Sequence, residues 1–173
     1  HGVIRPTQPL KRRRYLNAIE VESLADAAGP YRDLLLLLAY TGLRWGEVTA
    51  LHVSSVDPIR RRLMIEMSVT EINGIMESSD QPKDHQRRSV PYPAFLDTDI
   101  TARIEGRTPD DLVFTSPTGG IIRYGNARRD WFDPAVRAAA LGSLTPHELR
   151  HTAASLAVKA GASVLALQRM LGH

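Results

Sequence analysis

The hydrophobic pattern of the first third of the chain predicts helices. Between residues 15 and 28, apolar positions recur at near-helical intervals and stop at Gly29-Pro30, a pair that ends helices. Residues 31–43 predict a buried helix, because Leu34 to Leu38 are apolar on every side. A further helical stretch then runs to about Val53.

The pattern changes between residues 54 and 93, where short apolar runs alternate with turn residues. Residues 63–65, 66–75 and 88–92 predict strands, and Asn73-Gly74 is typical of a turn. Residues 111–114 suggest one more buried strand end.

The last third is again helical, over residues 125–140, 146–160 and 164–171. The order of these elements predicts a mainly helical α+β fold, with helices around a small antiparallel sheet.

Composition supports one folded domain. The chain has 173 residues, of which 43% are hydrophobic and 24% charged, so it can bury a core. Cysteine is absent, which excludes disulfides, thiolate metal sites and cysteine nucleophiles. The longest apolar run, residues 34–40, is far shorter than the roughly 20 residues that cross a bilayer, and no signal-peptide pattern is present. We expect an intracellular, cytoplasmic protein.

Positive charge gathers at the N-terminus. Residues 1–14 hold five basic residues and no acid, although 22 Lys and Arg against 19 Asp and Glu leave the chain at only +3. We expect residues 1–14 to be a basic linker or arm ahead of a domain over residues 15–173. Such an arm either follows nucleic-acid backbone or is a solvated linker. Its candidate DNA-binding residues are Lys11, Arg12, Arg13 and Arg14.

Residues 145–151 carry the most informative local motif. Thr145 and Glu148 have the spacing of a capping box, and Pro146 suits the first position of a helix. His147 and Arg150 then share one face of the first turn. A helix N-terminus favours anions, so an arginine and a histidine there suit a phosphate group.

Two other interpretations of the C-terminal segment stay open at this point. His147 and His151 form an H-E-x-x-H string, as in zinc hydrolases, although Arg150 on the same face disfavours a metal and no acid follows as a third ligand. Residues 156–173 have a helix–glycine turn–helix pattern, as in DNA-binding regulators, but this pattern does not explain the rest of the chain.

Four motifs in order resemble the catalytic domain of the tyrosine recombinases, the phage integrase type. They are residues 40–48 (YTGLRWGEV), Pro82-Lys83 ahead of residues 87–91 (RRSVP), residues 147–152 (HELRHT) and residues 171–173 (LGH). The resemblance covers about residues 15–173.

The resemblance implies a metal-free chemistry without a nucleotide cofactor. Such enzymes cut a DNA strand by attack of a tyrosine on the phosphodiester, which leaves a 3′-phosphotyrosine and a free 5′-hydroxyl, as in type IB topoisomerases. The strands rejoin by the reverse step. A phosphodiester transition state gathers negative charge, and arginine forks are well suited to bind it.

Matching by motif implies a role for each candidate residue. Arg44 and Arg150 would hold the scissile phosphate, and Lys83 would protonate the leaving 5′-oxygen. His147 and His173 would assist proton transfer and hold the phosphate. The supporting residues would be Glu47, which would stabilise the helix of Arg44, and His151, which we expect to pack. Arg87 and Arg88 are further candidates for DNA contacts.

The nucleophile itself has no match among the tyrosines. In the family it follows the motif at residues 171–173, and none of the five tyrosines here occupies that place. We therefore expect the sequence to be truncated before its nucleophile and inactive in cleavage. The implied partner is double-stranded DNA at attachment sites, and the full-length protein is expected to be a nucleoid-associated tetramer on it.

Overall fold

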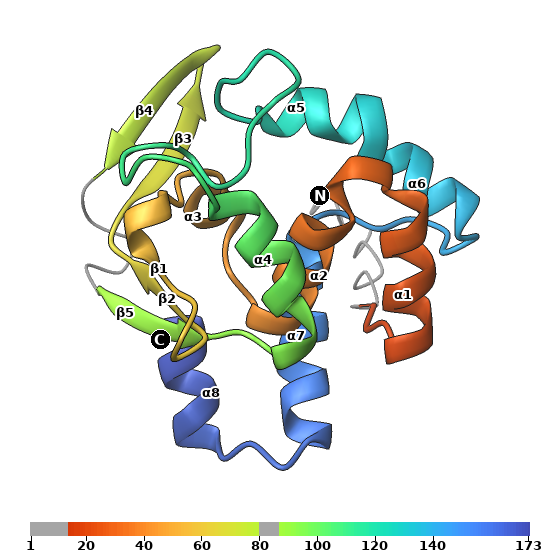
Figure 1. Ribbon diagram of the computed structural model, residues 1–173. Coiled ribbons are helices and arrows are strands. Elements are labelled where there is room, and N and C mark those ends of the chain that lie inside the picture. Colours follow the sequence, from red (N-terminus) through yellow and green to blue (C-terminus); the bar gives the residue numbers. More distant parts are fainter. Residues whose placement is uncertain (1–13, 80–86) are drawn as a thin grey trace, which may run out of the picture.

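The computed structural model describes residues 14–79 and 87–173. Helices and two small antiparallel sheets make up this part of the chain (Figure 1). The helices are α1 (Ala18–Ala27), α2 (Arg32–Thr41), α3 (Trp45–Thr49), α4 (Asp97–Ile104), α5 (Tyr124–Ala127), α6 (Asp133–Ala138), α7 (Glu148–Lys159) and α8 (Val164–Leu171). The strands are β1 (Val56–Asp57), β2 (Arg62–Ile65), β3 (Ser68–Ile72), β4 (Ile75–Ser79) and β5 (Arg88–Pro91).

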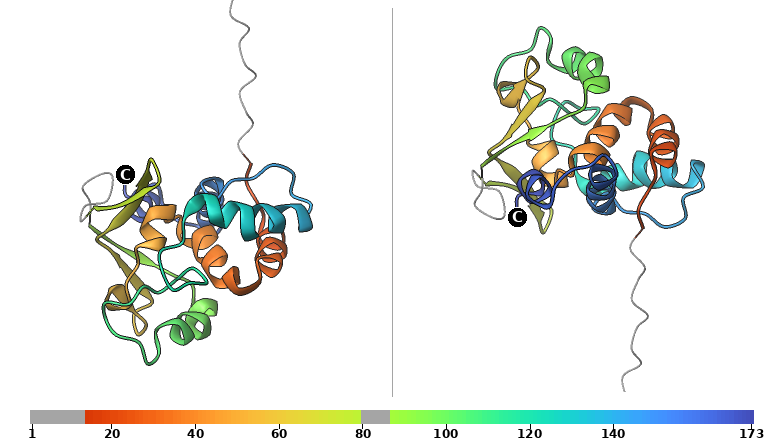
Figure 2. Two further views of the ribbon diagram at one scale, coloured as in Figure 1. Left: turned by 90° about the horizontal axis from the view of Figure 1, so that it is seen from above. Right: turned by 90° about the horizontal axis from the view of Figure 1, so that it is seen from below.

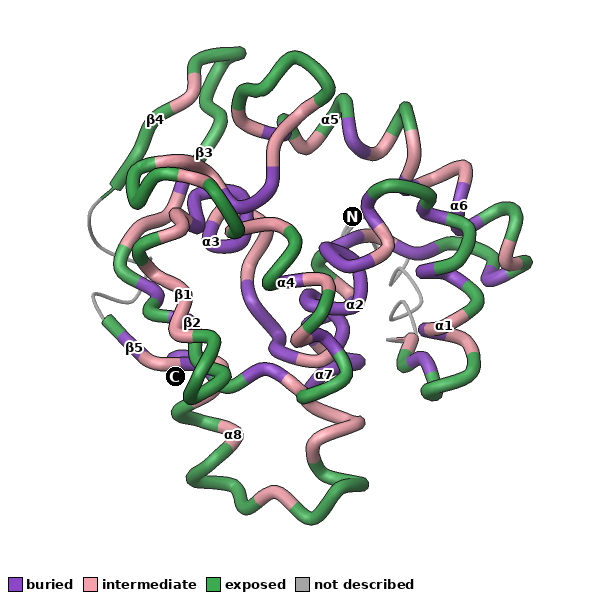
Figure 3. The backbone as a smooth tube through the Cα atoms, viewed as in Figure 1, coloured by how far each residue is buried: buried purple, intermediate pink, exposed green. Residues whose placement is uncertain are grey.

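Helix α2 lies at the centre of the core. The five leucines of residues 34–38 are each at most 1% exposed, because α1 and α7 pack against this helix. Figure 3 shows α2 in the buried colour, whereas α8 is mostly exposed. The uninterrupted apolar run therefore marks a helix whose leucines are buried on every side.

The strands lie on one side of the helical part, which the two views of Figure 2 show from above and below. One sheet has the order β1-β2-β5, with Leu63 of β2 opposite Val90 of β5. The other is the hairpin of β3 and β4, which turns at Asn73-Gly74. The fold is thus α+β with helices around small antiparallel strands, as predicted, although the strands form two sheets.

Several details differ from the hydrophobic pattern. The predicted helix after Gly46 ends at Thr49, where α3 gives way to a short turn. The predicted helix over residues 125–140 contains a π-helical turn, Arg128–Phe132, between α5 and α6. Helix α4 was not predicted, because Ile100 is its only buried residue and its apolar spacing is weak.

No helix in residues 14–79 or 87–173 is both long and apolar enough to cross a lipid bilayer.

Candidate active site

Arg44 stands at a sharp turn between α2 and α3. Gly42 ends α2 with φ = +69°, a conformation that glycine adopts without strain. Thr41 holds the turn, since its hydroxyl donates to Leu37 O (2.6 Å) and accepts from Leu43 N (3.3 Å). Arg44 is therefore presented at the first turn of α3 by a rigid backbone.

Glu47 binds the backbone of the same turn. Its Oε1 accepts a hydrogen bond from Arg44 N at 2.9 Å, the contact of a capping box, and lies 4.0 Å from Arg44 Nη1. The Glu47 side chain is 1% exposed. A buried carboxylate needs such partners, so Glu47 fixes the backbone and limits the side chain of Arg44.

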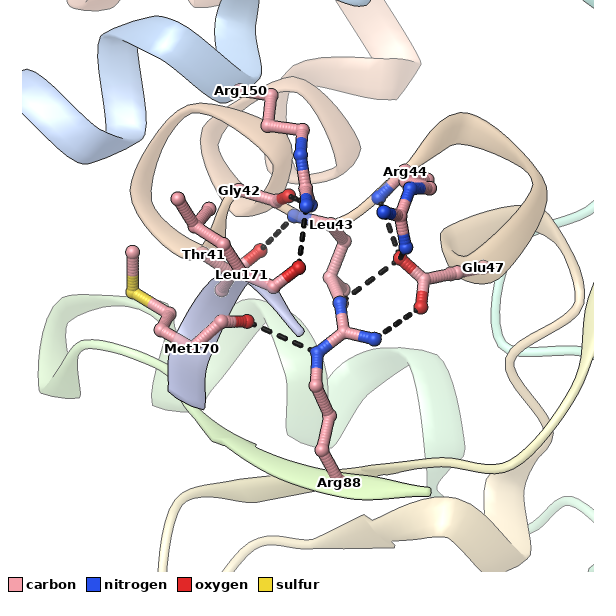
Figure 4. Close-up of polar contacts among 9 residues, drawn as sticks. All are labelled: Thr41, Gly42, Leu43, Arg44, Glu47, Arg88, Arg150, Met170 and Leu171. Atoms are coloured by element: carbon pink, nitrogen blue, oxygen red, sulfur yellow. Dashed lines mark hydrogen bonds and ion pairs between the residues drawn. The ribbon is translucent and has the colours of Figure 1, made fainter. Parts of the chain in front are cut away.

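Arg150, from α7, reaches this turn across 108 positions of the chain. Its Nη1 donates to Gly42 O at 2.6 Å, and its Nη2 donates to Leu171 O at the end of α8. Figure 4 shows the guanidinium of Arg150 beside the turn that presents Arg44. The structure thus brings the two arginines of the predicted phosphate site to one place.

His147 lies in the turn before α7 and is exposed. Its ring is perpendicular to that of His151, at 5.7 Å between centroids, and His151 also meets the edge of Tyr15 at 6.4 Å. The predicted helix start at Pro146 was two residues early, because α7 begins at Glu148. The carboxylate of Glu148 does accept from Thr145 N (2.7 Å), so one half of the predicted capping box is present.

His173 follows the C-terminal end of α8, which packs against β5. Gly172 ends this helix with φ = +73°, and the amide of His173 donates to Gln168 O at 2.9 Å. His173 is exposed, and it follows Gly172, whose backbone lies close to the guanidinium of Arg88.

Arg88 occupies a different environment from the DNA contact that we expected. It lies on β5 with 7% of its side chain exposed. Its Nη1 and Nη2 donate to the two oxygens of Glu47, at 2.5 and 3.0 Å, and its Nε donates to Met170 O at 3.0 Å. Because these contacts use the guanidinium inside the protein, Arg88 is buried among protein groups and does not face solvent.

The other basic candidates are exposed, paired elsewhere or outside the described residues. Arg87 is exposed, and Arg14 forms an ion pair with Glu20 at 3.3 Å. Lys83 and the arm residues Lys11, Arg12 and Arg13 fall in segments outside the described residues.

The sequence motifs did not predict that Arg88 points into the protein, although the alternation of residues along the strand indicates it. Along β5 the buried positions are Arg88 and Val90, which alternate with Ser89 and Pro91. The period of two therefore places Arg88 on the same face as a core valine.

The charges of the cluster favour an anion. The residues drawn in Figure 4 include three guanidinium groups, those of Arg44, Arg88 and Arg150, and one carboxylate, that of Glu47, which pairs with Arg88 and Arg44. Arginine stays protonated and binds phosphate oxygens through its planar fork. In the described part of the chain, no three His, Cys, Asp or Glu residues are grouped as metal ligands would be. The arrangement suits phosphodiester chemistry based on fixed cations and donors.

Comparison with known proteins gives a match over nearly the whole chain. The model of the phage integrase family matches residues 14–173. Tyrosine recombinase XerC of Corynebacterium efficiens is 30% identical over 156 residues, which cover 86% of this chain and 45% of the relative. Tyrosine recombinase XerD of Mycobacterium leprae is 30% identical over 173 residues, which cover 91% and 49%. The chain spans about half the length of these curated relatives.

Solved structures show the same fold. The integrase of transposon Tn1549, in complex with a circular intermediate DNA, superposes with a TM-score of 0.80 at 20% identity, over 99% of this chain and 60% of that one. These matches extend far beyond residues 147–173, so they do not favour the zinc-hydrolase or helix-turn-helix interpretations, both of which rest on that segment alone.

Proposed function

The chain belongs to the phage integrase family, and from this premise we propose that it is the catalytic domain of a site-specific recombinase that cuts and rejoins DNA through a 3′-phosphotyrosine. The observation that carries the proposal is the hydrogen bond from Arg150 to Gly42 O, because it places Arg150 at the turn that presents Arg44. The relatives are about twice as long as the chain, so this activity is proposed for the whole protein.

In the proposed reaction, Arg44 and Arg150 bind the non-bridging oxygens of the scissile phosphate. Their charge offsets the negative charge that grows on those oxygens in the transition state. The carbonyl contacts of Arg150 set the plane of its guanidinium before the substrate arrives, which lowers the cost of ordering it.

Proton transfer is assigned to the remaining candidates. Lys83 is proposed to protonate the leaving 5′-oxygen, because a lysine pKa can be lowered by its surroundings. His147 and His173 are proposed to assist, since both are exposed: His147 directly precedes α7, the helix of Arg150, and His173 follows the end of α8, where Arg150 binds Leu171 O. Glu47 is proposed to hold Arg44 without touching DNA.

The attacking tyrosine is proposed to lie outside the five tyrosines of this chain. Burial raises the pKa of Tyr31, Tyr40 and Tyr92 above 10.0, which disfavours the phenolate form of these three side chains. Tyr15 and Tyr124 meet other aromatic rings edge-on. We propose that the 173-residue chain alone binds double-stranded DNA without cleaving it, and that the whole protein assembles as a tetramer on DNA inside the cell, at the nucleoid.

The test is covalent capture on a nicked DNA substrate that traps the cleaved strand. In the whole protein, Arg44→Ala and Arg150→Ala should each lose about 2.7–4 kcal/mol of transition-state stabilisation, which is a rate loss of roughly 10²–10³. Arg32→Ala is the control, because Arg32 is a partly exposed arginine paired with Glu22 and Asp26 on α1. It should cleave at the parent rate.

Three results would contradict the proposal. Cleavage by the Arg44 and Arg150 variants within about tenfold of the parent would reject their roles. An adduct with the isolated chain would show that one of its own tyrosines attacks. No adduct with the whole protein on DNA carrying its recombination site would reject the recombinase function itself.

A further inference from the structure

The last turn of α8 is held by two arginines from distant parts of the chain. Arg88 Nε, on β5, donates to Met170 O at 3.0 Å, and Arg150 Nη2, on α7, donates to Leu171 O. The final carbonyls of a helix have no partner within it and carry partial negative charge, so cations stabilise them. These contacts fix the position of the helix end that precedes His173.

Arg88 also binds Glu47, and through it the backbone of Arg44. The two hydrogen bonds to Glu47, at 2.5 and 3.0 Å, form a bidentate pair between side chains that are 7% and 1% exposed. The same Oε1 that accepts from Arg88 Nη2 accepts from Arg44 N. The Arg88 guanidinium is therefore linked to the backbone of Arg44 through the Glu47 carboxylate, and it binds the end of α8 directly through Met170 O (Figure 4).

Gly172 allows this close approach. A Cβ atom built at residue 172 would lie 3.1 Å from Cζ and Nη1 of Arg88 and 3.2 Å from its Nε. These distances are shorter than ordinary van der Waals contact, so any side chain there would displace the guanidinium or the helix end. The backbone just before His173 thus rests directly on Arg88.

We propose that Arg88 is a positioning residue for strand cleavage, which ties the segment of His173 to the turn of Arg44. The inference rests on the proposed function and goes beyond it, because Arg88 acts through Glu47 and the end of α8 and does not touch DNA. Without the Arg88 guanidinium, Arg44 and His173 keep their functional groups, but their positions relative to each other are no longer fixed.

The structure offers a matched control in Arg103. This arginine likewise binds one carboxylate through two nitrogens, Asp33 at 2.7 and 2.8 Å, and donates to a carbonyl, Pro30 O at 2.7 Å. It joins α4 to the start of α2, and neither Asp33 nor Pro30 is among the residues drawn in Figure 4. Arg88→Lys and Arg103→Lys therefore remove the same kind of fork at two places.

The first measurement uses the whole protein and single-turnover cleavage at saturating DNA, at a temperature where circular dichroism shows both variants folded. We expect Arg88→Lys to lose at least about tenfold in cleavage rate while its Kd for DNA stays within about threefold of the parent. Arg103→Lys should keep the parent rate. Equal rates for folded Arg88→Lys and the parent, or equal losses in the two variants, would overturn the proposal.

The second measurement does not depend on catalysis. Amide hydrogen exchange of the 173-residue chain is compared at Arg44, whose N–H is bound by Glu47, and at His173, whose N–H is bound by Gln168 O. In Arg88→Lys both amides should exchange at least about tenfold faster, and in Arg103→Lys neither should change. If the parent protein fails to cleave DNA, the proposed function is rejected. The exchange measurement still tests the positioning role of Arg88, because unchanged exchange at both amides in Arg88→Lys would refute that role.

Discussion

At the scale of single residues, the site depends on close approaches that only small residues allow. Gly46, in the first turn of α3, lies against β3, and an added Cβ would be 2.3 Å from Val69 O and 2.7 Å from Ser68 Oγ. The nearest atom belongs to the backbone, so it cannot move aside as a side-chain tip could. Gly46 thus sets the distance between the helix of Arg44 and the hairpin.

Gly46→Ala should therefore lower the free energy of unfolding by about 1–3 kcal/mol, the usual cost of overpacking. Gly125→Ala is the matched control, because Gly125 is also helical but an added Cβ there meets no atom within 4 Å. It should be neutral or raise stability by up to about 1 kcal/mol through helix propensity. Urea denaturation measures both, and equal effects of the two substitutions would show that the contact with Val69 costs nothing.

At the scale of elements, the hairpin of β3 and β4 is held at its turn by one side chain. Arg123 Nη1, from the segment before α5, donates to Glu71 Oε1 and to Gly74 O, both at 3.0 Å. A two-stranded hairpin is only marginally stable by itself, so such contacts matter locally. The Arg123 and Glu71 side chains are 43% and 32% exposed, which limits what their ion pair adds to global stability.

Arg123→Ala should accordingly speed amide exchange in β3 and β4 by about two- to fivefold and leave the midpoint of global unfolding almost unchanged. Arg129→Ala serves as the control, since Arg129 pairs with its exposed neighbour Asp130, which lies outside the hairpin. Hydrogen exchange resolved by residue makes the comparison. A large shift in the midpoint of global unfolding would contradict this, because it would mean that the hairpin unfolds together with the rest of the protein.

At the scale of the whole molecule, three tyrosines with raised pKa values should make stability depend on alkaline pH. Burial is the main cause that raises the pKa of Tyr31, Tyr40 and Tyr92 above 10.0. Their neutral form is favoured in the folded state, so the stability they provide is complete below pH 10 and is lost as pH rises through the raised pKa values.

Urea unfolding should therefore give a lower free energy at about pH 11 than at about pH 8, with each tyrosine contributing at most roughly 1.4 kcal/mol per pH unit. Tyr92→Phe should reduce this dependence, because the Tyr92 hydroxyl is buried and has no hydrogen-bond partner in the described part of the chain. An unchanged slope in this variant would show that Tyr92 ionises freely in the folded protein.

The sequence by itself determined the local elements and the chemistry available. The apolar run of residues 34–38 predicted the central helix, and Asn73-Gly74 predicted a turn, which in the structure joins β3 to β4, because both features depend on neighbours along the chain. The order of the motifs led to the family, which the match over residues 14–173 confirms.

Only the tertiary structure decided which of those groups share a site. Arg150 meets Gly42 across 108 positions, and Arg88 turns inward to Glu47 across 41, because packing of α7, α8 and β5 around α2 and α3 sets these distances. Local pattern specifies a backbone conformation and a buried face, whereas the partner of a buried charge depends on which distant segment the core brings beside it.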